Sequence, residues 1–149
     1  MNMKWIFVAL LVFSAAIGGG VYVLSKAGHG AGTEVDWRLL GQLDYLSNKA
    51  TTELQQVDGK LVKIPGFIVP LDDDNRLVTE FLLVPNPQAC IHVPPPPPNQ
   101  MVFVKMKKGV EATVGAPVWV YGKFKIATTR SQYGEVSFEV EGDTVEPYR

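Results

Sequence analysis

The sequence predicts a mainly β protein whose folded part is a small five-stranded barrel of the oligonucleotide-binding type, with a small β-sandwich as the alternative. Five segments rich in β-branched and aromatic residues support this, and most of them alternate between apolar and polar positions. They are residues 61–71, 76–85, 101–106, 117–127 and 135–140. Gly, Asn and Asp turn signals separate them. A chain of 149 residues suits one such domain, and no internal repeat is visible.

An apolar segment comes first in the chain. Residues 6–24 carry no charge and lie between Lys4 and Lys26. As a helix they would be about 28 Å long, close to the hydrocarbon thickness of about 30 Å. We expect residues 1–26 to be a signal anchor or a signal peptide, and either outcome delivers the remainder of the chain outside the cytoplasm.

The stretch 27–35 is small and polar, which is typical of a flexible tether. It carries His29, which we expect to be solvated rather than a metal ligand. The folded domain then spans residues 36–149. It is predicted to begin with a short amphipathic helix over residues 36–46, with Thr33 or Asp36 as the cap.

The first predicted strand, residues 61–71, is interrupted by Pro65, Gly66 and Pro70. Proline cannot donate to a ladder, so a bent strand or an edge strand is expected. Residues 72–75, with three aspartates, form the predicted hairpin tip. They lack the alternating oxygen ligands and terminal glutamate of a calcium loop, so a solvated turn is the better interpretation.

The return strand, residues 76–85, is mostly apolar on both faces, which predicts a central strand. Glu80 is the exception on it. A carboxylate in such a strand is expected to be solvated or to have a cationic or metal partner.

The three later strands are separated by turn signals at residues 108–109, 115, 131–134 and 142–143. Glycines at positions 66 and 122 would kink their strands. Such kinks favour a sheet that curls into a small closed or partly open barrel.

The motif ACIHVPPPPPNQ, residues 89–100, holds the only cysteine of the chain. On an extended segment Cys90 and His92 point to the same side, because alternate residues share a face. A thiolate and an imidazole are two of the four ligands that zinc takes. Glu80 is the candidate third ligand. Glu139 and Asp143 come next, and water or a partner protein could complete the shell.

Two other interpretations of the motif remain open. Cys90 could be a small buried apolar residue with His92 at the surface. It could also be a nucleophile activated by His92. The motif offers no strand-to-helix elbow, and the prolines remove N–H groups that an oxyanion hole would use, so we expect no enzyme.

The five prolines, Pro94, Pro95, Pro96, Pro97 and Pro98, predict a polyproline II rod of about 15 Å. It would serve as a rigid connector that re-enters a strand at once through Asn99 and Gln100. The alternative is that residues 94–100 form a docking surface for a partner protein. A formal net charge of −1 argues against nucleic acid as that partner.

These stretches resemble a known bacterial family, catalogued as domain of unknown function 3299. The resemblance rests on VDGKLVKIPGFIVPLD, TEFLLVPNPQACIHVPPPPPNQMVFV, PVWVYGKF and GDTVEPY, and ACIHVPPPPPNQ is its most specific part. It implies a periplasmic protein or lipoprotein, in some members associated with ABC transporters and periplasmic binding proteins of zinc uptake.

The resemblance thus implies zinc binding by Cys90 and His92 in a transport accessory protein, held in the bacterial inner membrane by one helix or released into the periplasm. This chain departs from lipoprotein members because no lipidation cysteine lies near its apolar segment. It also lacks a histidine-rich loop.

Overall fold

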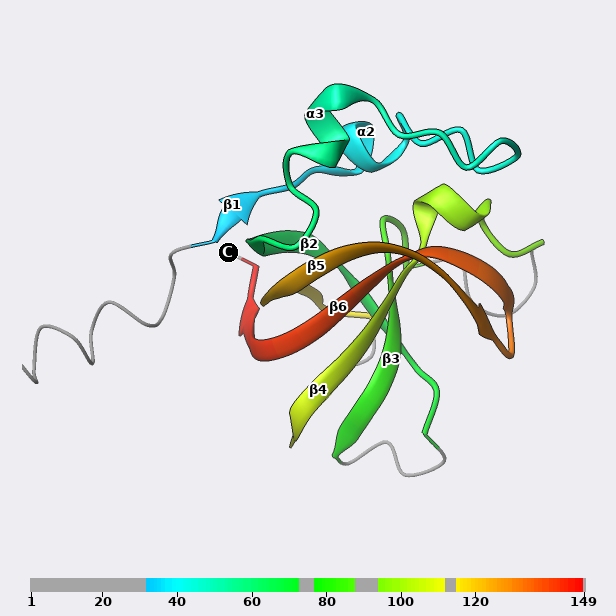
Figure 1. The fold of residues 1–149 in the computed structure, drawn as a ribbon. Coiled ribbons are helices and arrows are strands. Elements are labelled where there is room, and N and C mark those ends of the chain that lie inside the picture. Colours follow the sequence, from blue (N-terminus) through cyan, green and yellow to red (C-terminus); the bar gives the residue numbers. More distant parts are fainter. Residues whose placement is uncertain (1–31, 73–76, 88–93, 112–114, 149) are drawn as a thin grey trace, which may run out of the picture. The chain divides into compact units, whose positions relative to one another are not determined.

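The computed structural model describes residues 32–72, 77–87, 94–111 and 115–148 (Figure 1). Its elements are β1 (Thr33–Glu34), α2 (Trp37–Leu40), α3 (Thr52–Gln55), β2 (Leu61–Pro70), β3 (Val78–Val84), the 3-10 turn η1 (Pro98–Gln100), β4 (Val102–Val110), β5 (Pro117–Ser131) and β6 (Gly134–Pro147). Strands dominate, which confirms the prediction of a mainly β protein.

The predicted anchor, residues 1–26, and His29 lie outside the described residues. Within those that are described, no helix has both the length and the apolar character needed to cross a membrane.

The five longer strands form a ring. β2 pairs with β3, β3 with β4, β6 with β5 and β5 with β2, all antiparallel, while β4 and β6 are parallel. The short β1 adds to β2 in parallel. All five predicted strands are present, and β4, β5 and β6 continue beyond their predicted ends.

Two predicted turns are therefore wrong. Residues 108–109 lie inside β4, and residues 142–143 lie inside β6. The glycine at 142 serves close packing instead of a turn, because a Cβ there would overlap Sδ of Met106 on the neighbouring strand. The turn predicted at 131–134 is confirmed, because β5 ends at Ser131 and β6 begins at Gly134, which has φ +123°.

β2 changes partners along its length. Residues Leu61 to Phe67 pair with β5, and Phe67 to Pro70 pair with β3. A Cβ on Gly66 would lie 2.8 Å from the Val84 carbonyl oxygen of β3, so the missing side chain lets β2 cross close to β3. The sequence predicted either a bent strand or an edge strand here. The bent strand is confirmed, and the edge strand is wrong, because β2 has strand neighbours on both sides.

The predicted helix is real but shorter. Asp36 caps α2 by accepting a hydrogen bond from the Leu39 N–H at 2.8 Å, and the helix ends at Leu40, before Gly41. Thr51 caps a second turn, α3, which the sequence did not reveal. The Trp37 indole donates to the Pro65 carbonyl at 2.6 Å, which ties α2 to the bend of β2.

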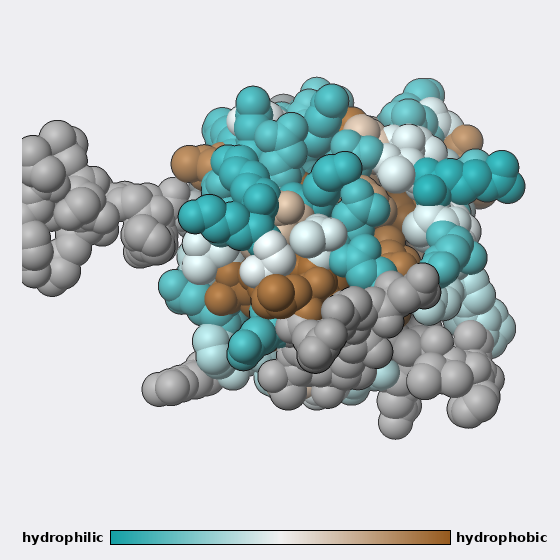
Figure 2. All heavy atoms as spheres, turned by 90° about the horizontal axis from the view of Figure 1, so that it is seen from below, coloured by the Kyte–Doolittle hydropathy of each residue, from teal (hydrophilic) through white to brown (hydrophobic). Residues whose placement is uncertain are grey.

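Apolar side chains pack on both faces of β3, as predicted for a central strand. Phe81 and Leu83 belong to the main core, where the Phe124 and Phe138 rings lie 5.4 Å apart. On the opposite face a second cluster is formed by Val69, Leu82, Val84, Met101 and Val136, with Phe67, Leu71 and Phe103 half-buried beside them. Figure 2 shows that an apolar band reaches the surface between hydrophilic residues on the face seen from below.

Candidate functional site

The predicted ligands Cys90 and His92 lie in residues 88–93, outside the described part of the chain. Their surroundings are therefore approached from the two flanks of that segment. One flank is β3, which ends at Val84 in the second apolar cluster. The other is the proline run, described from Pro94 onward.

Glu80, the predicted third ligand, has a cationic partner. It lies opposite Lys105 in the β3–β4 ladder, and the Lys105 Nζ is 2.9 Å from its Oε1. The hydrogen bond to Glu80, together with the charge of that carboxylate, raises the pKa of Lys105 above its ordinary value. The Glu80 side chain is 37% exposed, so solvent reaches it. A metal at Glu80 would have to replace Lys105.

Asp72 closes the connection between β2 and β3. One carboxylate oxygen accepts the Thr79 N–H at 2.7 Å, the Thr79 hydroxyl at 3.0 Å and the Glu80 N–H at 3.2 Å. These bonds, the Thr79 N–H first, hold the pKa of Asp72 below its ordinary value. Asp72 thus fixes the backbone at Glu80. The rest of the predicted hairpin tip, residues 73–75, lies outside the described residues.

The proline run is fastened to α2 and the loop after it. The Asn99 side-chain amide donates to the Leu43 carbonyl at 3.0 Å and to the Gly41 carbonyl at 3.4 Å. The Gln100 side-chain amide donates to the Trp37 carbonyl at 3.3 Å. The amides of these two residues therefore serve an intramolecular contact.

The backbone of the run is extended up to η1. Pro97 has φ −62° and ψ 156°, the values of polyproline II, and no cis peptide bond occurs among the described residues. The predicted direct return into a strand is wrong, because the 3-10 turn η1 precedes β4. The exposed side chains of the run are Pro94, Pro95 and Pro97, while Pro96 and Pro98 are half-buried.

Glu139 and Asp143, the next candidate ligands, each have another partner in the structure. Glu139 accepts a hydrogen bond from the Thr129 hydroxyl, and Asp143 lies 2.5 Å from the Lys107 Nζ. The bond to Asp143 raises the pKa of Lys107. Within the described ranges no group of three or more His, Cys, Asp or Glu side chains could hold a metal ion.

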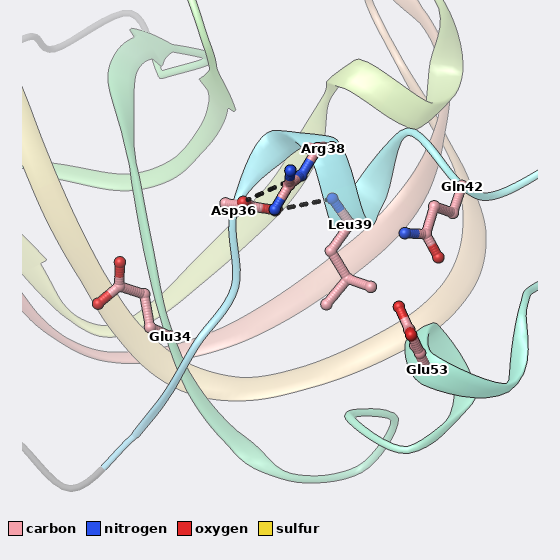
Figure 3. A pocket seen from close by; sticks show the side chains of 6 residues that line it. All are labelled: Glu34, Asp36, Arg38, Leu39, Gln42 and Glu53. Carbon is pink, nitrogen blue, oxygen red and sulfur yellow. Dashed lines mark hydrogen bonds and ion pairs between the residues drawn. The ribbon is translucent and has the colours of Figure 1, made fainter.

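A pocket of about 360 Å³ lies between β1, α2 and α3 (Figure 3). Its lining residues are Glu34, Asp36, Arg38, Leu39, Gln42 and Glu53. Asp36 divides its carboxylate between the cap of α2 and Arg38, whose Nε is 3.8 Å away. Because Glu34 is also paired with the Lys63 ammonium at 3.0 Å, the three carboxylates of this pocket are balanced by two cations nearby.

Sequence reasoning missed this pocket and the partner of Glu80 for the same reason. Glu34, Arg38 and Glu53 come from three separate elements, and Lys105 reaches Glu80 only through strand register. The sequence did hold a weak signal for the Glu80–Lys105 pair, because an outward-facing glutamate on one strand favours a lysine on the neighbouring strand.

Comparison with known proteins adds one family and one solved fold. A family model described as "Protein of unknown function (DUF3299)" matches residues 41–147. The chain also shares 36% sequence identity with a DUF3299 family protein from Pseudomonas aeruginosa PAO1 whose crystal structure is known. That match has a TM-score of 0.66 and covers 80% of this chain and 98% of the other. No curated protein matches the chain.

Proposed function

Since the chain belongs to the DUF3299 family, whose model assigns no function, we propose from its own residues that it binds a divalent transition metal, most suitably zinc, through Cys90 and His92. A thiolate and an imidazole two residues apart suit the borderline-soft zinc ion better than magnesium or calcium, which prefer oxygen ligands. The chemistry of the two donors therefore fits zinc.

The observation that supports this proposal is the fastening of the segment on both sides. Before it, β3 is held in the ring by β2 and β4. After it, Asn99 and Gln100 bind the proline run to α2 and its loop. Two anchored ends reduce the conformational freedom of a short segment, and therefore lower the entropic cost of bringing two ligands to one metal.

Glu80 is the proposed third ligand. It is solvent-accessible and its present partner is a lysine at the surface, 69% exposed, which water can solvate on release. Ion pairs of this exposed kind are weak, so a metal can compete with Lys105 for the carboxylate. The fourth position would be filled by water or by a group from a partner, which suits transfer of the metal rather than permanent storage.

The ring of β2 to β6 is proposed to be a small barrel of the oligonucleotide-binding type. Five strands, a pairing that returns to β2, and the bend of β2 support it. The sandwich alternative would need two separate sheets, whereas β5 bonds directly to β2. The net charge of −1 gives such a barrel no general affinity for nucleic acid.

The proposed setting is the periplasmic side of a bacterial inner membrane. Residues 1–26 would anchor the domain, or would be cleaved as a signal. Residues 27–32 would tether it, whereas residues 33–35 of the predicted tether belong to the fold, because Thr33 and Glu34 form β1 and Val35 is buried in the core. There the domain would assist a transport system, delivering metal to or from an ABC-type transporter or its periplasmic binding protein. This role is non-catalytic.

The test is the metal content of the purified protein. We expect zinc in stoichiometric amounts by mass spectrometry, lost in Cys90→Ser and in His92→Ala. His29→Ala removes the other histidine of the chain and should keep the full zinc content. Equal zinc in all four proteins, or none in the wild type, would refute the proposal.

A second candidate function is a protein-protein interaction module without metal. The exposed Pro94, Pro95 and Pro97 support it, since extended proline runs dock on aromatic grooves of partners. A photo-crosslinker at position 95 should then capture one specific membrane-complex subunit, and chelator should not change the yield. Capture that disappears with chelator would instead favour the metal site.

A further inference from the structure

An aromatic patch lies on the outer face of the β2–β5 ladder, next to β1. It consists of Leu61, Lys63, Trp119, Tyr121 and Tyr148. Leu61 is 56% exposed and Tyr148 48% exposed, while Trp119 and Tyr121 are half-buried. Lys63 and Tyr121 are cross-strand partners, and so are Pro65 and Trp119, so the side chains of the patch share one face.

Three members of the patch, Lys63, Trp119 and Tyr148, contact one another. The Trp119 and Tyr148 rings lie 5.0 Å apart, and the Lys63 Nζ lies 4.6 Å from the centre of the Trp119 ring. The Tyr148 N–H donates to the Pro117 carbonyl at 3.0 Å, which holds the C-terminal residue of the patch against β5.

The two carboxylates beside the patch already have partners. Glu34 lies 3.0 Å from the Lys63 Nζ, and Glu146 accepts a hydrogen bond from the Tyr121 hydroxyl at 3.2 Å. Burial and the nearby Glu146 raise the pKa of that hydroxyl. The patch therefore offers a ligand ring surface and the apolar side chain of Leu61, with the exposed Lys123 opposite Leu61 in the ladder.

We propose that this aromatic patch rests in the headgroup region of the lipid bilayer. The proposal depends on the membrane anchor proposed above. Trp and Tyr prefer the bilayer interface because a ring with one polar end suits a boundary between hydrocarbon and water. Lys63 fits the same boundary, with an apolar stem along the patch and an ammonium held between the Trp119 ring and Glu34 at its edge.

The position of the patch in the chain favours the bilayer over other partners. Glu34 of β1 contacts Lys63 directly, so the patch begins where the tether enters the domain. Residues 25–32 reach at most roughly 30 Å when fully extended. A domain of this size has a radius of gyration of about 13 Å, so a patch beside the tether meets the bilayer more readily than one on the far side.

The experiment uses the full chain labelled with 5-fluorotryptophan in nanodiscs of phosphatidylcholine and phosphatidylglycerol. The chain has three tryptophans, and single Phe substitutions assign their fluorine signals. Nitroxide-bearing lipid should broaden the Trp119 signal at least twofold. The double variant Leu61→Asp and Tyr148→Asp should abolish this broadening. Leu46→Asp is the matched control, because Leu46 is 86% exposed in the loop after α2, and it should leave the broadening unchanged.

Three outcomes would overturn the proposal. If the protein co-purifies with nanodiscs but nitroxide lipid does not affect the Trp119 signal, the bilayer contact of the patch is contradicted and the membrane anchor is not. Failure of the protein to co-purify with nanodiscs contradicts the anchor and the patch together. A Trp119 shift with soluble N-acetylglucosamine oligomers, without any lipid effect, would assign the face to glycans instead.

Discussion

The Lys105 ammonium and the Glu80 carboxylate lie 2.9 Å apart across the β3–β4 ladder, on the strand that leads to Cys90 and His92. This pair occupies the carboxylate that the metal hypothesis requires. It therefore allows the role of Glu80 to be tested separately from that of Cys90 and His92.

Lys105→Met is expected to raise the zinc affinity several-fold, because Glu80 no longer has a cationic competitor. Isothermal titration at low salt, where exposed charges are least screened, measures it. Lys107→Met is the matched control, since it removes the equivalent ion pair with Asp143 and should not change the affinity. An unchanged affinity in Lys105→Met would exclude Glu80 as a ligand, and a raised affinity in Lys107→Met would instead assign a ligand role to Asp143.

Asp72→Asn should make the thermal stability less dependent on acid. The folded pKa of Asp72 lies below its ordinary value of 3.8, so its ionised form stabilises the fold above about pH 4. That contribution is lost as the pH falls through the folded pKa. Melting temperatures by circular dichroism should differ between wild type and variant at pH 7 and converge towards pH 2. A constant difference across this range would contradict the role of the Asp72 carboxylate.

Gly122→Ala should lower the free energy of unfolding by about 1–3 kcal/mol, the usual cost of overpacking a filled site. A Cβ at this position would overlap the backbone carbonyl oxygen of Glu141, which cannot move aside as a side chain can. Gly109→Ala is the control in β4, where the nearest atom would be Leu77 Cβ at 3.2 Å. Urea denaturation of both variants measures the difference, and similar losses would refute the argument.

Asn99→Ala should cost about 0.5–1.5 kcal/mol of stability, the net value of a typical hydrogen bond. Its amide holds the proline run to the Gly41 and Leu43 carbonyls. If the run frames the metal ligands, zinc affinity should also fall several-fold, whereas Gln56→Ala at an exposed position should change neither quantity. If Asn99→Ala lowers the stability but leaves the zinc affinity unchanged, the proline run does not position the metal ligands.

Local signals in the sequence were sufficient for much of the fold. Alternation and a high content of β-branched residues revealed all five ring strands, and Asp36 marked the start of α2. The two wrongly predicted turns both came from glycine. Gly109 and Gly142 read as turn signals, yet both lie within strands, and at 142 the small residue lets β4 and β6 approach. Only tertiary packing distinguishes these two uses of the same residue.

The candidate site was less predictable because its contacts are long-range. The sequence identified Cys90 and His92 as donors and Glu80 as an unusual carboxylate. It could not pair Glu80 with Lys105, since that depends on register after a long connection. Likewise the sequence did not reveal that Asn99 and Gln100 bind backbone carbonyls of α2 and its loop, far earlier in the chain.

The divided pairing of β2 affects how the protein reaches its native state. The first half of β2 bonds to β5, which is synthesised long after it, whereas the second half bonds to β3, its immediate successor. A β2–β3 hairpin can form as soon as both strands have emerged, but ring closure must wait for β5. Until then the first half of β2 offers unpaired N–H and C=O groups to other chains. The parallel pairing of β1 at Val62 and Lys63 covers the opposite edge of β2, so it leaves these groups exposed until β5 arrives.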